Sequence, residues 1–197
     1  MKAQTYIFIG RSGCGKGTQA ELLKKYLAEK VPENPTYHFQ SGAKFREFIK
    51  GPGEVSRISR ETYVRGDLQP EFLAIWAWTE LFIENLTPEK TLIIDGFPRK
   101  VNEAKILDGA MEFLNREKPH IIFLNVSRKW AEERMLGRHR SDDEIKNINI
   151  RLDWYEHDIV PVIEYLRKES GHNFFEVNGE QTVEDVWKEI EAKLKIS

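Results

Sequence analysis

Residues 5–27, TYIFIGRSGCGKGTQAELLKKYL, place four glycines within eight positions, between a strand-like run and a helix-like run. These glycines let successive backbone N–H groups converge on one point without obstruction by Cβ atoms. A helix that begins near Lys16 directs the positive end of its dipole at the same point, and Lys16 adds a full charge. The stretch therefore predicts a nest for the phosphate groups of a nucleotide. A glycine-rich turn without a ligand is the alternative, which the flanking strand and helix disfavour.

Apolar runs suited to buried strands recur at 5–9, 36–39, 91–95, 120–126 and 173–177. Helix-length segments separate them, and this alternation predicts an α/β fold with a parallel sheet covered by helices on both faces. Residues 41–85 interrupt the alternation with three expected short helices. Further helices are expected after a capping residue at Thr182 and, with a bend at Pro161, over 141–169.

The 197 residues carry 30 basic and 32 acidic side chains, a formal net charge of −2. This balance gives no general electrostatic reason to bind nucleic acid or an acidic membrane. No apolar stretch approaches the roughly 18–20 residues that span a bilayer, and the first residues do not resemble a signal peptide. The single cysteine, Cys14, excludes an internal disulfide and is interpreted as a small filler rather than a catalytic thiol. We expect a single cytoplasmic domain; the sequence does not indicate its oligomeric state.

Residues 91–100, TLIIDGFPRK, form the second informative stretch. A buried strand that ends at Asp95 brings a carboxylate to the C-terminal edge of the sheet, where open α/β sheets bind ligands. Phosphoryl transfer requires a carboxylate near the magnesium shell and arginines that neutralise developing charge, and Asp95 and Arg99 fit those roles. A surface turn with an incidental charge pair is the alternative.

Residues 133–152, ERMLGRHRSDDEIKNINIRL, place arginines on both sides of two aspartates. Planar, permanently charged guanidinium groups suit repeated bidentate contact with phosphate. Arg151 follows Arg140 by 11 residues, which is about 16 Å along a helix, so the two can reach different phosphates of a long ligand. A solvated helix face is the alternative interpretation, and Asp142 and Asp143 can be simple helix caps.

Taken together, these motifs resemble those of the adenylate kinase family of nucleoside monophosphate kinases. GxxGxGKGTQ at 10–19 resembles the family's P-loop, and DGFPR at 95–99 matches the family signature at every position. The generic Walker A pattern fits less well, because Gly17 occupies its Ser/Thr position. The resemblance covers essentially the whole chain and implies a P-loop NTPase fold with a five-stranded parallel sheet. Its expected parts are a core (1–40, 86–137 and 141–197), a helical insertion that binds the nucleoside monophosphate (41–85) and a minimal lid (138–140).

The resemblance implies reversible transfer of the γ-phosphoryl group of ATP to AMP, giving two ADP, with Mg²⁺ as cofactor. The residues expected to bind ATP are Gly13, Cys14, Gly15, Lys16, Gly17, Thr18, Arg134, Arg138 and Gln181. Those expected to bind AMP are Ser41, Gly42, Arg46, Leu68, Gln69, Gly96, Arg99, Glu103, Arg140 and Arg151. Those expected to act in catalysis are Lys16, Asp95, Arg99, Arg138, Arg140 and Arg151. No side chain is expected to bind the metal directly; Asp95 would orient magnesium-bound water. The Phe97–Pro98 bond should be cis.

Some positions depart from the family pattern. Only His139 separates Arg138 from Arg140, so the lid is reduced to a turn. The place four residues after DGFPR, where adenylate kinases typically carry a glutamine, holds Glu103. A carboxylate only accepts hydrogen bonds, so Glu103 suits adenine N6 but repels N1, whereas guanine offers two donors. Asn102 could supply the missing amide if the turn is shifted by one residue. Relaxed or non-adenine acceptor specificity (GMP, CMP, UMP) therefore stays open.

Two other functions also stay open. A P-loop kinase of a small metabolite would share the sheet and the loop, but the DGFPR string and the paired aspartates argue against it. A nucleotide-dependent regulator would bind ATP and hydrolyse it slowly, without producing ADP in response to a nucleoside monophosphate.

The wall of the acceptor pocket also departs from the family pattern, with polar Gln69 where valine is usual and Ala43 in place of a frequent aspartate.

Overall fold

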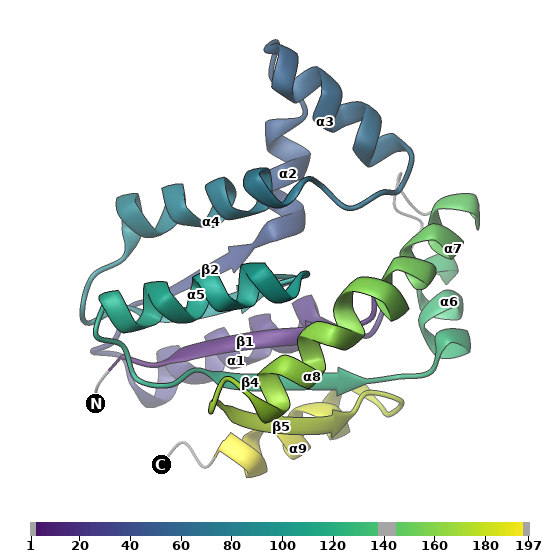
Figure 1. Ribbon diagram of the computed structural model, residues 1–197. Coiled ribbons are helices and arrows are strands. Elements are labelled where there is room, and N and C mark those ends of the chain that lie inside the picture. Colours follow the sequence, from purple (N-terminus) through teal and green to yellow (C-terminus); the bar gives the residue numbers. More distant parts are fainter. Residues whose placement is uncertain (1–2, 138–144, 195–197) are drawn as a thin grey trace.

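The structure of the protein is a computed structural model that describes residues 3–137 and 145–194. Its centre is a five-stranded parallel sheet in the order β2-β3-β1-β4-β5 (Figure 1). The strands are β1 (Thr5–Gly10), β2 (Thr36–Gln40), β3 (Thr91–Asp95), β4 (His120–Asn125) and β5 (Asn173–Asn178). Each strand begins and ends within one residue of the apolar run that predicts it. The expected sheet is therefore confirmed.

Side chains of the central strand β1 alternate between two apolar cores on opposite faces of the sheet. Ile7 and Ile9 belong to one core, and Tyr6 and Phe8 belong to the other. The first face is covered by α4 (Glu71–Asn85), α5 (Val101–Phe113) and α8 (Val160–Lys168), and the second by α1 (Lys16–Lys30) and α9 (Val183–Leu194). Because helices cover both faces, the three inner strands β1, β3 and β4 are largely apolar and buried, as their sequences predict.

The order of the strands creates a crevice at one edge of the sheet. From β1 the chain crosses to β2 at the sheet edge, whereas from β3 it crosses to β4 on the far side of β1. The two strands are nevertheless neighbours, with Phe8 paired to Asp95. In open α/β sheets, ligands bind outside the carboxyl ends of two strands whose connections diverge in this way. The two glycine-containing motifs of the sequence begin at these two ends.

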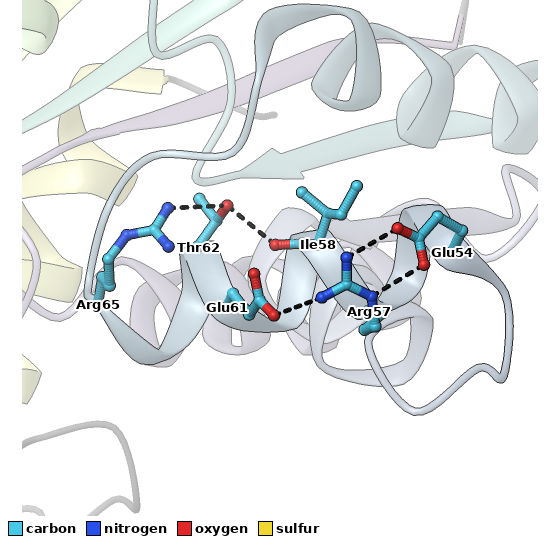
Figure 2. Close-up of polar contacts among 6 residues, drawn as sticks. All are labelled: Glu54, Arg57, Ile58, Glu61, Thr62 and Arg65. Carbon is cyan, nitrogen blue, oxygen red and sulfur yellow. Dashed lines mark hydrogen bonds and ion pairs between the residues drawn. The ribbon is translucent and has the colours of Figure 1, made fainter.

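Residues 41–85 form α2 (Ser41–Phe48), α3 (Glu54–Val64) and α4, the three helices that the sequence predicts. In Figure 1, α3 stands away from the sheet. One face of α3 carries exposed ion pairs, in which Arg57 contacts Glu54 at 2.7 Å and Glu61 at 2.6 Å (Figure 2). Such exposed pairs contribute little to stability, so this face of α3 is a solvated surface.

The helical stretch over residues 145–168 is not a regular α-helix throughout. After α6 (Arg128–Gly137), the chain is described again from α7 (Ile145–Trp154), which passes through a π-helical turn, η1 (Tyr155–Ile159), into α8. In this turn the N–H of Val160 donates to the carbonyl of Tyr155, five residues earlier. Pro161 follows at once, and because proline has no N–H and its ring clashes with the preceding turn, the helix widens there. The sequence predicts a bend at Pro161, and the structure has a π-helical turn immediately before Val160 and Pro161.

The predicted cap of α9 is confirmed, since the Oγ1 of Thr182 accepts a 3.2 Å hydrogen bond from the N–H of Asp185. The capping box expected at 141–144 lies outside the described residues. Within residues 3–137 and 145–194, no helix combines the length and the apolar character that crossing a membrane requires.

Candidate active site

A cleft of about 790 Å³ opens at the carboxyl ends of β1 and β3. It is bordered by the turn after β1, the start of α2, the turn after β3, and side chains of α6 and α7. Among the described residues, its lining contains five basic side chains, Lys16, Arg46, Arg99, Arg134 and Arg151, and two acidic ones, Glu21 and Asp95. The chain as a whole carries a net charge of −2. The cleft therefore concentrates positive charge locally, which suits an anionic ligand.

The turn after β1, residues 10–17, is named the P-loop here. Gly10 and Gly13 adopt φ angles of 146° and 86°. A Cβ atom on Gly10 would lie 2.5 Å from the carbonyl oxygen of Leu124, and one on Gly13 would lie 2.6 Å from that of Ala131. Only glycine fits both the backbone angles and these close approaches. The two glycines thus let the P-loop curl tightly against β4 and α6.

Lys16 is the first residue of α1 and borders the cleft. Its Nζ donates hydrogen bonds to the carbonyl oxygens of Gly10 at 2.8 Å and Arg11 at 2.7 Å. The ammonium group is therefore held across the P-loop, within the same cavity as the start of α1. Cys14 is 5% exposed and packs in the core with the residues of α1, which fits its interpretation as a filler.

Arg11 anchors the P-loop to two other segments of the chain. Its Nε donates to the carbonyl of Val126 at 3.0 Å, and its Nη1 pairs with Glu156 at 2.6 Å. The guanidinium carbon also lies 4.0 Å from the ring centroid of Tyr155. These contacts join the P-loop to the end of β4 and to η1. We infer no ligand role for Arg11, because it does not border the cleft.

The turn after β3 contains the predicted cis peptide bond between Phe97 and Pro98. Within it, the Nε of Arg99 donates to the carbonyl of Gly96 at 2.8 Å, and the Nη2 donates to the Oγ of Ser41 at 3.4 Å. The Ser41 hydroxyl in turn donates to Gly96 at 2.8 Å. Arg99 is thereby fixed between the end of β3 and the start of α2, facing the cleft that both segments border.

The electrostatic surroundings of Arg99 are mixed. Burial lowers the pKa of Arg99 from its ordinary value, and the positive charge of Arg151 lowers it further, while Glu103 and Asp95 oppose this shift. An arginine guanidinium is permanently protonated in proteins, so Arg99 keeps its positive charge in the cleft. Two guanidinium groups close enough to affect each other in this way are stabilised when an anion binds between them.

The cleft brings together nearly all of the described residues that the sequence singles out. On the predicted ATP side these are Gly13, Cys14, Gly15, Lys16, Gly17, Thr18, Arg134 and Gln181. On the predicted AMP side they are Ser41, Gly42, Arg46, Gln69, Gly96, Arg99 and Arg151, and Asp95 lies between the two sets. Arg138 and Arg140, together with the predicted lid 138–140, lie outside the described residues.

Leu68 and Glu103 instead border a smaller cavity that shares Ser41 and Arg99 with the cleft. Its other walls are largely apolar and come from Phe45, Ala74 and Phe97. Gln69 borders both the cleft and the smaller cavity, and its side-chain amide is hydrogen-bonded to Ser59. The amide oxygen accepts from the Ser59 hydroxyl at 2.7 Å, and the amide N–H₂ donates to the Ser59 backbone carbonyl at 3.0 Å.

Glu103 is 2% exposed and caps α5 from within this smaller cavity. Its Oε2 accepts hydrogen bonds from the N–H groups of Arg99 at 2.7 Å and Lys100 at 3.3 Å. Burial raises the pKa of Glu103, and these two N–H groups oppose the shift. The neighbouring Asn102 is exposed and donates to Glu71. The hypothesis that Asn102 supplies an amide to this cavity is therefore wrong.

Two aromatic residues of the site were not predicted from the sequence. Trp154 borders the cleft, and Trp130 lies under Arg134, whose guanidinium carbon is 5.0 Å from the indole centroid. For Trp154 a signal was present, because it stands three residues after Arg151 and so lies on the same side of a helix. For Trp130 the signal was its spacing of four from Arg134.

Comparisons with known proteins agree with this geometry. The family model for adenylate kinase matches residues 8–171. The chain is 32% identical over 189 residues to an adenylate kinase of Azobacteroides pseudotrichonymphae, covering 94% of each chain. It is 31% identical to adenylate kinase 1 of a Nostoc strain, covering 95% of this chain and 97% of that one. Adenylate kinase isoenzyme 5 of Homo sapiens is 31% identical, covering 96% of this chain and 32% of the human protein.

Proposed function

Since the chain belongs to the adenylate kinase family, we propose that it transfers the γ-phosphoryl group of ATP to AMP and forms two ADP. It is a nucleoside monophosphate kinase with a P-loop and a five-stranded parallel sheet. One observation supports the proposal most strongly: Lys16 and Arg99 line the same positively charged cleft from opposite segments. Two phosphate-bearing ligands can therefore meet there end to end.

On the donor side, the P-loop N–H groups and Lys16 would hold the phosphates of ATP. Arg134 and Gln181 border the same end of the cleft. Arg134, supported by the ring of Trp130, presents a flat guanidinium face that suits the donor base. The carboxylate of Asp95 lies close to Gly17, since its Oδ2 would be 3.3 Å from a Cβ placed on that glycine. Thr18 is the next residue of the chain.

The residues near Asp95 fit a magnesium ion that accompanies ATP. Within the described residues, no group of three or more His, Cys, Asp or Glu side chains is placed to hold a metal. A single carboxylate beside a P-loop matches the way Mg²⁺ is usually held, by phosphates, waters and one or two carboxylates. Asp95 would orient water bound to the ion, which when bound neutralises phosphate charge.

On the acceptor side, Arg46 and Arg99 would hold the phosphate of AMP, with residues 41–85 as the acceptor-binding insertion. Arg151 would lie beside the group in transfer, since it borders the cleft on α7. Arg138 and Arg140 are proposed to join it on family grounds. The γ-phosphoryl group then passes directly from ADP as leaving group to the phosphate oxygen of AMP. The protein positions the two oxygens and neutralises the charge that spreads over the phosphoryl oxygens.

An acceptor-dependence assay tests this proposal. With ATP and Mg²⁺ present, we expect the purified protein to form ADP only when a nucleoside monophosphate is added. With AMP as acceptor it should form two ADP for each ATP used, and with another monophosphate one ADP and one molecule of the corresponding diphosphate. Coupled measurement of ADP with AMP, GMP, CMP, UMP and their deoxy forms gives the acceptor preference. ADP release from ATP alone at the same rate would instead support the slow-hydrolysing regulator.

The contacts of Glu103 favour an acceptor base other than adenine, or a weaker preference for adenine. Its Oε2 is used by two backbone N–H groups, whereas its Oε1 has no hydrogen-bond partner among the described residues. An ionised carboxylate offers only acceptor atoms to a base. Adenine presents one donor and one acceptor on its N6–N1 edge, and guanine presents two donors at N1 and N2. Compared with a glutamine at this position, Glu103 therefore favours guanine over adenine as the acceptor base, or weakens the preference for adenine.

Glu103→Gln is expected to raise the ratio of kcat/KM for AMP to kcat/KM for GMP at least fivefold. The amide oxygen can still accept from Arg99, and the amide N–H₂ can donate to adenine N1. A mismatched buried hydrogen bond costs about 1–3 kcal/mol, which corresponds to a factor of roughly 5 to 150. The measurement is the pair of kcat/KM values for each protein. Asn102→Ala, on the exposed neighbour, is the matched control and should leave the ratio unchanged; a ratio that falls in Glu103→Gln would contradict the assignment.

A further inference from the structure

Trp154 connects two parts of the cleft that come from distant segments of the chain. Its indole Nε1–H donates a 3.2 Å hydrogen bond to the carbonyl of Gly66, which lies between α3 and α4. The same ring lies 5.5 Å from the guanidinium carbon of Arg99, in the turn after β3. One half-buried side chain thus contacts both the helical insertion and an arginine of the cleft.

The turn at Gly66 packs directly on the backbone of α7. Gly66 is buried and has a φ of 80°. A Cβ placed there would lie 3.3 Å from both the Cα and the Cβ of Asn147. This spacing is tighter than ordinary van der Waals contact, and the left-handed φ would strain any other residue there, so the turn at Gly66 packs closely against Asn147 of α7. In Figure 1, the end of α3 lies on the side of the molecule where α7 lies.

Asn147, Arg151 and Trp154 are separated by four and three residues, and therefore lie along one face of α7. At one end of this face Asn147 packs against Gly66, and at the other end Trp154 donates a hydrogen bond to the carbonyl of Gly66. Arg151, between them, borders the cleft. The contacts that hold the insertion against α7 thus flank an arginine that faces the cleft.

The ring of Trp154 also limits where the Arg99 guanidinium can lie. Gly96 and Ser41 hold that group by its nitrogen atoms, and the indole contacts it as a cation–π partner. A guanidinium within about 6 Å of an indole centroid is attracted to it, more strongly when the pair is partly desolvated. Loss of the ring would leave Arg99 with its two hydrogen-bonded contacts and a wider range of positions.

We propose that Trp154 is a positioning residue for the acceptor side of the cleft. It holds the turn at Gly66 against α7 and keeps the guanidinium of Arg99 facing the acceptor phosphate. It acts through these two residues and not on the reacting atoms. This inference rests on the proposed function, because it assumes that the insertion and Arg99 hold a nucleoside monophosphate. Trp154 also borders a small cavity with Gly10, Ser12 and Lys16 of the P-loop, but its hydrogen bond and its cation–π contact go to Gly66 and Arg99. The KM for the acceptor should therefore depend on Trp154 more than the KM for ATP.

The test uses two substitutions that remove the contacts in steps. Trp154→Phe keeps an aromatic ring but has no N–H for Gly66, and Trp154→Leu also removes the ring from Arg99. Kinetics are measured with the best nucleoside monophosphate found for the wild-type protein. Trp154→Phe should raise the KM for this acceptor threefold to tenfold, as expected for one lost hydrogen bond, with kcat and the KM for ATP within twofold. Trp154→Leu should raise the acceptor KM further and lower kcat at least fivefold.

Trp187→Phe is the matched control, because Trp187 packs edge to face against Tyr26 between α9 and α1, away from Trp154. All its kinetic constants should stay within twofold of wild type. If Trp154→Leu leaves the acceptor KM and kcat within twofold, or raises the KM for ATP and acceptor by the same factor, Trp154 is a packing residue and the inference is wrong. If the wild-type protein transfers phosphate to no nucleoside monophosphate, the proposed function fails, and this inference fails with it.

Discussion

Replacement of Lys16 by methionine is expected to lower kcat about 10²- to 10³-fold, the usual effect of losing one donor aimed at charge that develops in a transition state. The Lys16 ammonium is held by the carbonyls of Gly10 and Arg11 at the mouth of the P-loop, in the cleft. From there it can move to the β- and γ-phosphate oxygens of ATP. Methionine fills similar space without a charge. Steady-state ADP formation measures the loss.

The fold of Lys16→Met should survive, because the lysine is only partly buried and its two carbonyl partners border a cleft that water can enter. Thermal unfolding should shift by no more than a few degrees, since about 1 kcal/mol corresponds to about 2–4 °C for a chain of this size. Lys25→Met, on the exposed side of α1, provides the control and should keep wild-type turnover. A Lys16→Met protein that retains more than a tenth of the wild-type kcat would contradict the role given to this residue.

Replacement of Arg99 by lysine is expected to lower kcat/KM for the acceptor by about 10²-fold, although the charge is retained. Arg99 is fixed by Gly96, Ser41 and Trp154 on different parts of its guanidinium. A lysine ammonium is a flexible point charge that cannot keep these contacts and also present two parallel N–H donors to a phosphate. Transfer depends on holding the acceptor oxygen in line, so poor positioning lowers the rate as well as the affinity.

The control for Arg99→Lys is Arg57→Lys on the exposed face of α3, where the arginine pairs with Glu54 and Glu61 (Figure 2). That substitution should leave all kinetic constants within twofold. The KM for ATP should change less than threefold in Arg99→Lys, because the P-loop is unaffected. Equal losses for ATP and acceptor, together with a lower unfolding temperature, would show damage to the fold and count against a direct role for Arg99.

The P-loop could be predicted from the sequence because its requirements are local. Gly10 and Gly13 adopt backbone angles that belong to the loop itself, although the close approaches that also require glycine there are to Leu124 and Ala131, far along the chain. The central strands β1, β3 and β4 could be predicted for a similar reason, since burial on both faces makes them mostly apolar runs. In both cases the physical constraint acts on neighbouring residues, and their pattern shows it.

The acceptor side depends on contacts between distant residues, which no local pattern displays. Arg99 contacts Ser41, which is 58 positions away in the sequence, and Trp154, which is 55 positions away. That Ser41 and Arg99 share a site was expected only from the resemblance to a family, and the contact with Trp154 was not expected. Glu103 shows another limit: its Oε2 caps α5 through backbone N–H groups, and the Lys100 that precedes the helix is not a usual capping residue. The sequence therefore placed Glu103 at the acceptor pocket without revealing that half of its carboxylate is already used.

Two-substrate initial-rate kinetics test the central claim, that one cleft binds both nucleotides at once and that the phosphoryl group passes directly between them. ATP is varied at several fixed concentrations of the preferred nucleoside monophosphate. The account predicts lines that intersect in a double-reciprocal plot, because both ligands must be bound before transfer. Parallel lines, with a phosphorylated form of the protein isolated after incubation with ATP alone, would contradict it.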